Sequence, residues 1–71
     1  MSNYKEYYMI YNYTDVYGNF EDAEHTQAKN DSDAINWAKD KIARLREFCD
    51  YGYRIHGGTL YCYQRVVATI D

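Results

Sequence analysis

The chain has 71 residues and no proline, and its 8 basic and 11 acidic side chains give a formal net charge of −3. A chain this short buries only about 60% of its unfolded surface, so residues 1–71 form one domain with a small core. The charge balance argues against direct nucleic-acid binding, which depends on clustered lysine and arginine. The first residues lack a signal peptide, and no run approaches the roughly 18 apolar residues of a membrane span, so we expect a cytoplasmic protein without a membrane partner.

Residues 5–14, KEYYMIYNYT, predict a strand in the middle of a sheet. The run is rich in aromatic and branched residues and has no breaker, which is typical of a strand covered on both faces. Because side chains alternate along a strand, Tyr8 and Ile10 point to one face. The opposite face carries Tyr7, Met9, Tyr11 and Tyr13.

A turn and a second strand follow. Residues 15–19, DVYGN, contain the glycine, Asp and Asn residues that favour turns. Residues 20–29 are more polar and predict a returning strand at an edge of the sheet.

The segment 30–33, NDSD, predicts the start of a helix, with Asp31 or Ser32 as the N-cap and acidic residues near the positive end of the helix dipole. Apolar residues then recur at helical spacing, and Gly52 is the expected left-handed cap at the end. The predicted stripe consists of Ala34, Ile35, Ala38, Ile42, Leu45 and Cys49, with Trp37 and Phe48 along its margin.

After the helix, two β-prone runs flank Gly57-Gly58, which predicts a hairpin that turns at these glycines. With a two-residue loop, Ile55 lies opposite Leu60 and Tyr53 lies opposite Cys62. We expect one face to pack on the helix: Leu60, Cys62, Val66, Ala68 and Ile70. The other face would carry Tyr61, Tyr63, Arg65 and Val67.

The predicted order of elements is ββαββ. The simplest arrangement is an α+β fold in which an antiparallel four-stranded sheet carries one helix packed on one face.

The sequence contains no motif typical of an enzyme or a metal site. His25 and His56 stand apart without paired-ligand spacing, and no serine or cysteine lies in a nucleophile motif. Asp22 and Glu24 share a strand face, but nothing in the sequence separates their pKa values for acid and base roles. We therefore expect no catalysis, cofactor or metal, and reduced thiols at the two cysteines, unless Cys49 and Cys62 meet under the helix.

Ten tyrosines are the most distinctive feature of the composition. Tyrosine and arginine are frequent anchors at protein interfaces, because one ring offers both an apolar body and a polar tip. We expect a platform on the sheet face away from the helix, made of Tyr7, Tyr11, Tyr13, Tyr61 and Tyr63 with Arg54 and Arg65. The alternative is that several of these rings fill a thin core.

Acidic residues are concentrated between the first strand and the helix. Asp15, Glu21, Asp22 and Glu24 precede two further aspartates at the helix start, against one cation, Lys29. Such an acidic lobe steers a basic partner surface toward it. The alternative is a solvated loop and strand.

The layout resembles that of small phage and mobile-element proteins of the anti-CRISPR type. The resemblance is based on three features: a short acidic chain, a tyrosine-rich sheet, and one helix that begins within residues 28–34, AKNDSDA. These proteins share no common motif, so no functional residue carries over. The resemblance implies an inhibitor that occupies a host defence protein or nucleoprotein.

The leading hypothesis is a non-catalytic binding protein that docks on a basic protein surface through exposed tyrosines and the acidic lobe. A second hypothesis is a dimeric sponge for a nucleotide-like ligand, which would stack on tyrosines and pair with Arg54 and Arg65. A third is a homodimeric interaction module built on the outer sheet face.

Overall fold

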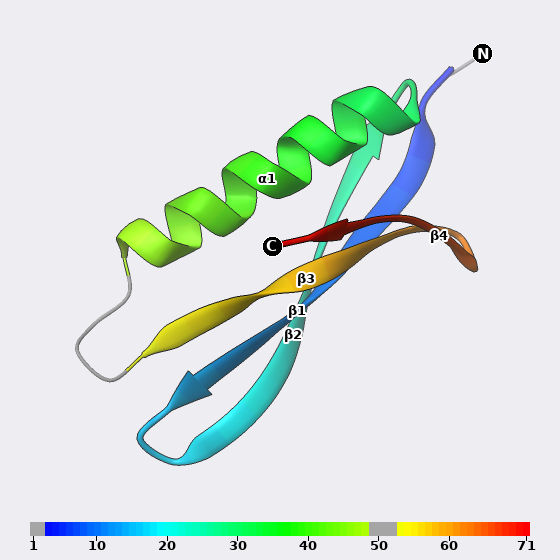
Figure 1. The fold of residues 1–71 in the computed structure, drawn as a ribbon. Helices are drawn as coiled ribbons and strands as arrows, with labels where there is room; N and C mark the ends of the chain where they lie inside the picture. Colours follow the sequence, from blue (N-terminus) through cyan, green and yellow to red (C-terminus); the bar gives the residue numbers. More distant parts are fainter. Residues whose placement is uncertain (1–2, 49–52) are drawn as a thin grey trace.

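A computed structural model describes residues 3–48 and 53–71 of the chain. The elements follow the order β1 (Lys5–Asp15), β2 (Gly18–Ala28), α1 (Asp31–Glu47), β3 (Arg54–Cys62) and β4 (Arg65–Ile70). The strands form one antiparallel sheet in the order β2-β1-β3-β4, with α1 packed across one face (Figure 1). The predicted α+β fold and its ββαββ order are confirmed. Among the described residues, no helix is both long and apolar enough to cross a membrane.

The β1–β2 hairpin is the longest feature of the sheet. The two strands stay paired from Lys5↔Ala28 to Asp15↔Gly18, so only Val16 and Tyr17 form the turn. Gly18 has a φ of 135°, a conformation that side-chain-bearing residues rarely adopt. β1 is central and β2 lies at an edge, as the sequence predicts.

The helix begins one residue earlier than expected. Asn30 is the N-cap, because its side-chain oxygen accepts a hydrogen bond from the Asp33 backbone N–H at 2.8 Å. The prediction of Asp31 or Ser32 as the cap was wrong, and this frees the Asp31 carboxylate for other partners. Phe48 caps the other end and is 82% exposed, so it does not flank the core. The predicted cap Gly52 and Cys49 lie outside the described residues.

The last hairpin turns at a different place from the prediction. β3 continues straight through Gly57 and Gly58, and the turn falls at Tyr63 and Gln64. A Cβ on Gly58 would lie 2.8 Å from the Ile10 backbone oxygen, so this glycine allows close packing against β1 rather than a reversal. The predicted pairs Ile55–Leu60 and Tyr53–Cys62 are therefore wrong.

The strand partners in the structure differ accordingly. Ile55 pairs with Tyr13 of β1, and Leu60 lies between Met9 and Ala68. Bulges interrupt the register between Asn12 and Tyr13 of β1 and between Leu60 and Tyr61 of β3. The second bulge places Val66 opposite Tyr61 on the outer face, so Val66 is 56% exposed and does not pack on the helix as predicted.

The core lies between α1 and the sheet. Because the helix supplies two alanines and one isoleucine, large side chains from the strands fill the space. The buried residues of the core are Tyr7, Met9, Tyr11, Ala28, Ala34, Ala38, Ile42, Ile55, Leu60, Cys62 and Ile70. The Cys62 thiol is free and buried.

Candidate binding surfaces

The structure overturns the outward orientation predicted for three tyrosines of β1. Tyr7 is 1% exposed and Tyr11 is 5% exposed, and both lie beneath α1. Tyr13 is half-buried on the same side, where its ring stacks on Phe20 and Tyr53 with centroid separations of 5.7 and 5.0 Å. These three tyrosines support the fold and cannot form a platform on the opposite face. The small alanines on the helix explain why rings of this size fit there.

Burial changes the acidity of the two core phenols. Burial raises the pKa of Tyr7 to about 12, aided by its hydrogen bond to Asp31. Burial also raises the pKa of Tyr11 to about 12, with smaller contributions from the charges of Asp22 and Glu24. Both phenols therefore stay neutral in all but strongly alkaline solution.

The outer face of the sheet carries a different aromatic pair. Tyr8 and Tyr61 stack across β1 and β3 with ring centroids 5.0 Å apart and an interplanar angle of 13°. His25 approaches Tyr8 from β2 at 6.0 Å. Each ring covers one face of the other, so the pair has less open ring surface for stacking a base than two separate tyrosines would have. Tyr61 belongs to the predicted platform and Tyr8 does not, although strict alternation from the buried Met9 places Tyr8 on this outer face.

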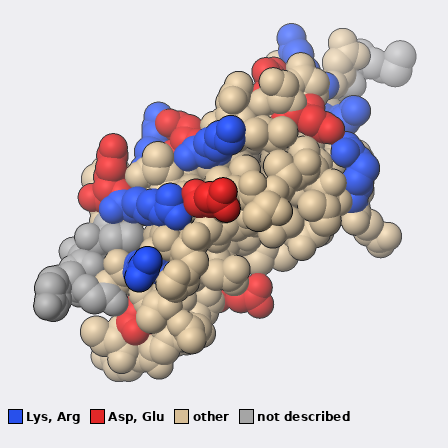
Figure 2. Space-filling model, viewed as in Figure 1, with Lys and Arg blue, Asp and Glu red and all other residues tan. Residues whose placement is uncertain are grey.

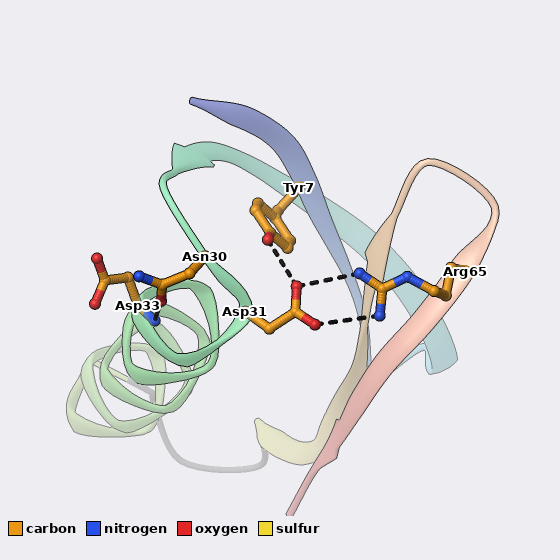
Figure 3. A network of polar contacts seen from close by, with 5 residues as sticks. All are labelled: Tyr7, Asn30, Asp31, Asp33 and Arg65. Atoms are coloured by element: carbon orange, nitrogen blue, oxygen red, sulfur yellow. Dashed lines mark hydrogen bonds and ion pairs between the residues drawn. The ribbon is translucent and has the colours of Figure 1, made fainter. Parts of the chain in front are cut away.

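The Arg65 side chain binds Asp31 of α1 and does not lie on the outer face of the sheet. Its guanidinium donates two hydrogen bonds to the Asp31 carboxylate, at 3.2 and 3.1 Å, and the Tyr7 hydroxyl donates a third at 2.8 Å (Figure 3). Hydrogen bonds from Arg65 and Tyr7 hold the pKa of Asp31 below its ordinary value. Arg65 therefore does not belong to the outward set in which it was predicted.

The arginines do not gather in one place with the predicted tyrosines. Arg54 is the first residue of β3, whereas Arg65 pairs with Cys62 at the end of that strand. Tyr63 is 66% exposed in the β3–β4 turn and has a φ of 56°. The predicted anchors do not share one surface. Tyr7, Tyr11 and Arg65 lie on the helix side, whereas Tyr61 lies on the outer face. Arg54 and Tyr63 lie near opposite ends of β3.

The predicted acidic lobe divides between the start of α1 and the β1–β2 hairpin, which carries Asp15, Glu21, Asp22 and Glu24. Three of these four hairpin carboxylates have local partners. Asp15 accepts a hydrogen bond from the Tyr17 backbone N–H at 2.7 Å, and Asp22 accepts one from Ala23 at 2.8 Å. Glu24 lies 3.9 Å from Lys41 of the helix. Within residues 3–48 and 53–71, the exposed Glu21 carboxylate has no hydrogen bond or ion pair.

Exposed apolar side chains stand beside these acids at the free end of the hairpin. We call residues 15–22 the hairpin end; it extends away from the helix-covered part of the sheet (Figure 1). Val16 is 78% exposed, Tyr17 is 87% exposed and Phe20 is 42% exposed. By contrast, acidic and basic side chains alternate over the helix (Figure 2), where Asp40 pairs with Arg44 at 3.0 Å.

An open hollow of about 640 Å³ adjoins the hairpin end. It is lined by Asn12, Tyr13, Asn19, Phe20, Glu21 and His56. Beside it, the Thr14 hydroxyl donates to Asn19 Oδ1 at 2.6 Å and lies 2.6 Å from His56 Nε2. A hydroxyl has one proton, so His56 Nε2 must donate to Thr14, and in the neutral ring Nδ1 is the free acceptor.

The direction of these hydrogen bonds limits what Thr14, Asn19 and His56 can do chemically. With Thr14 donating to Asn19, His56 Nε2 is the donor in its contact with the Thr14 hydroxyl. Among the described residues, no three His, Cys, Asp or Glu side chains gather in a way that could hold a metal ion. The arrangement is suited to hydrogen bonding with a bound group.

No protein-family model, curated protein or solved structure matches the chain.

Proposed function

We propose that this chain is a non-catalytic binding protein that docks on a basic surface of a protein partner through the hairpin end. The observation that carries the proposal is the placement of three exposed apolar side chains, Val16, Tyr17 and Phe20, among acidic residues. Aromatic anchors provide much of the binding energy at interfaces, and the surrounding charges select the partner and speed association. The hairpin end combines both on one projecting element.

A narrower form of the proposal follows from the layout of the chain. A partner with a basic surface that normally holds nucleic acid would be blocked when the hairpin end occupies that surface. This matches inhibition of a host defence protein or nucleoprotein by a small phage-type protein. Its support is the acidic character of the hairpin end, which would compete with phosphate groups for the same cations.

The test is capture of a partner from host lysate on immobilised protein, followed by titration with the purified partner. We expect Tyr17→Ala to weaken that binding by roughly 30-fold, the effect of losing an anchor of about 2 kcal/mol. Raising the salt concentration should also weaken it. Tyr63→Ala, which removes an exposed ring from the β3–β4 turn, is the matched control. Equal binding by the two variants would contradict the role of the hairpin end.

A second candidate, the homodimer, is favoured by one observation on the outer sheet face. Two rows of side chains without formal charge cross all four strands there. One row is His25, Tyr8, Tyr61 and Val66, and the other is Ala23, Ile10, Thr59 and Thr69. A two-fold axis along the strands between β1 and β3 would place Tyr8 over Tyr61 of the second copy, which is a self-complementary contact.

Light scattering tests the homodimer directly. We expect a concentration-dependent dimer that Tyr61→Lys abolishes, because a charge would be buried in a neutral interface. Tyr63→Lys introduces the same charge outside this face and should leave the dimer intact. A monomer at all concentrations would exclude this candidate and leave the hairpin-end proposal untouched.

A further inference from the structure

We infer that the hollow beside the hairpin end is a receptor for an arginine side chain of the partner, with Glu21 as the counter-ion. The inference rests on the proposed function, because it names the chemical group on a basic partner that this part of the molecule would hold. The hollow is lined by residues of β1, β2 and β3, so it is built by the sheet rather than by the turn alone.

Among the four acids of the β1–β2 hairpin, Glu21 is the one whose carboxylate has no partner within the described residues. The carboxylates of Asp15, Asp22 and Glu24 are engaged by backbone N–H groups or by Lys41. Glu21 lines the hollow, and in the described part of the chain its carboxylate has no hydrogen bond or ion pair. An unpaired carboxylate in a hollow favours a cationic ligand there.

The other polar residues at the hollow add hydrogen-bond acceptors. The contact with the Thr14 hydroxyl selects the Nε2–H tautomer of the His56 imidazole, in which Nδ1 is an acceptor. The Asn12 amide also lines the hollow, and within the described residues its side chain makes no hydrogen bond. Carboxylate, amide and imidazole acceptors together suit a ligand that carries several donors.

Arginine fits this set better than lysine. A guanidinium carries five N–H donors in a rigid plane and pairs with a carboxylate through two parallel hydrogen bonds. Tyr13 and Phe20 complete the lining, but their rings stack on each other on the helix side of the sheet, so the polar side chains provide the contacts with the guanidinium. A lysine ammonium is a compact charge that would leave acceptors around a hollow of about 640 Å³ without partners.

The test uses small probes, so it does not require the partner. Nα-acetyl-arginine amide, Nα-acetyl-lysine amide and Nα-acetyl-citrulline amide are titrated into the ¹⁵N-labelled full chain, and amide shifts are followed by NMR. Citrulline has nearly the shape of arginine without its charge. We expect saturable shifts at Asn12, Glu21 and His56 with the arginine probe, weaker shifts with the lysine probe and none with citrulline.

Two matched variants locate the counter-ion. Glu21→Gln should weaken arginine binding about tenfold or more, the effect of losing a charged hydrogen bond. Glu24→Gln removes the same charge from the opposite face of β2 and should change it by less than about twofold, because an exposed, distant charge is screened. The amide spectrum of each variant shows whether its fold is intact.

The inference is overturned if citrulline and arginine shift the same amides equally, if no saturable shift occurs, or if Glu24→Gln weakens binding as much as Glu21→Gln. Its failure is distinguishable from failure of the proposed function. Partner binding that depends on Tyr17 without any arginine-probe binding removes only the arginine receptor. Arginine-probe binding without a partner that depends on Tyr17 removes only the docking role of the hairpin end.

Discussion

Asp31 and Arg65 join the first turn of the helix to the first residue of β4, through hydrogen bonds of 3.2 and 3.1 Å (Figure 3). The Tyr7 hydroxyl from β1 meets the same carboxylate at 2.8 Å. One side chain at the start of the helix therefore ties together three elements far apart in sequence. Their joint dependence on the Asp31 charge makes the fold sensitive to acid at this point.

We predict that Asp31→Asn flattens the acid limb of the stability profile. The pKa of Asp31 is lowered in the folded state, first by the hydrogen bonds from Arg65, so the unfolded chain binds this proton at a higher pH. The stability that it contributes is present above an ordinary aspartate value of 3.8 and is lost as pH falls below that value. Urea unfolding between pH 5 and about 2.5 measures the slope. Asp33→Asn, in the same helical turn, is the control and should leave the slope close to that of the wild type.

The buried phenols predict a second loss of stability, in alkali. The pKa values of Tyr7 and Tyr11 are raised from 10.0 to about 12, so the unfolded chain ionises these rings first. Stability is complete below pH 10 and falls as pH rises toward 12, by up to about tenfold in the folding constant per pH unit for each ring. Tyr7→Phe or Tyr11→Phe should reduce this slope in urea unfolding. Tyr17→Phe, at an 87% exposed position, should not change it.

Alanine substitutions should separate core tyrosines from surface tyrosines. Tyr7→Ala would leave a large cavity under the helix and is expected to destabilise the domain by about 3–5 kcal/mol, which approaches the whole stability of a small domain. Tyr8→Ala loses a stacked pair on the outer face, worth about 1 kcal/mol beyond its buried area. Tyr63→Ala should lie within about 0.5 kcal/mol of the wild type. Thermal or urea unfolding gives this order; a surface-like value for Tyr7→Ala would contradict its placement.

The glycines of β3 give a further prediction about packing. A Cβ at Gly58 would meet the Ile10 backbone oxygen at 2.8 Å, and backbone cannot move aside as a flexible side chain does. We expect Gly58→Ala to destabilise the domain by about 2–3 kcal/mol. Gly18 has a φ of 135° but open space around it, so Gly18→Ala should cost only about 1 kcal/mol of backbone strain. Chemical denaturation of both variants tests this difference.

The architecture was predictable because each element is marked by strong local patterns. The breaker-free run of β1, the Asn and Asp residues before α1 and the alanine–isoleucine stripe of the helix agree with one another. The Gly57-Gly58 pair was misleading, because the same residue that permits a tight turn also permits close contact between strands. Only the tertiary position of Gly58 against β1 distinguishes these two uses.

The site was harder to predict, because tyrosine is compatible with burial and with exposure. Tyr7 and Tyr8 are adjacent and identical, and the helix alone decides that the first is buried. Likewise, Arg65 has a typical anchor residue type, but Asp31 holds it on the helix side. The sequence itself shows the cluster of acids in the hairpin. Contacts between strands decide that Glu21 has no partner among the described residues and which ring nitrogen of His56 carries the proton.

Arg46 of α1 binds the backbone of two other segments of the chain, β3 and the residue after β4. Its Nε donates to the Ile55 carbonyl at 3.2 Å and its Nη1 to the Asp71 carbonyl at 3.1 Å. The pairing of β3 with β4 ends at Gly58, so Ile55 lies on a part of β3 that β4 does not cover. The Arg46 guanidinium takes the place there that a neighbouring strand would have filled. Unfilled positions of this kind recruit strands from other molecules and seed aggregates. Because Arg46 occupies this one, a strand of a second molecule would have to displace the guanidinium before it could pair there.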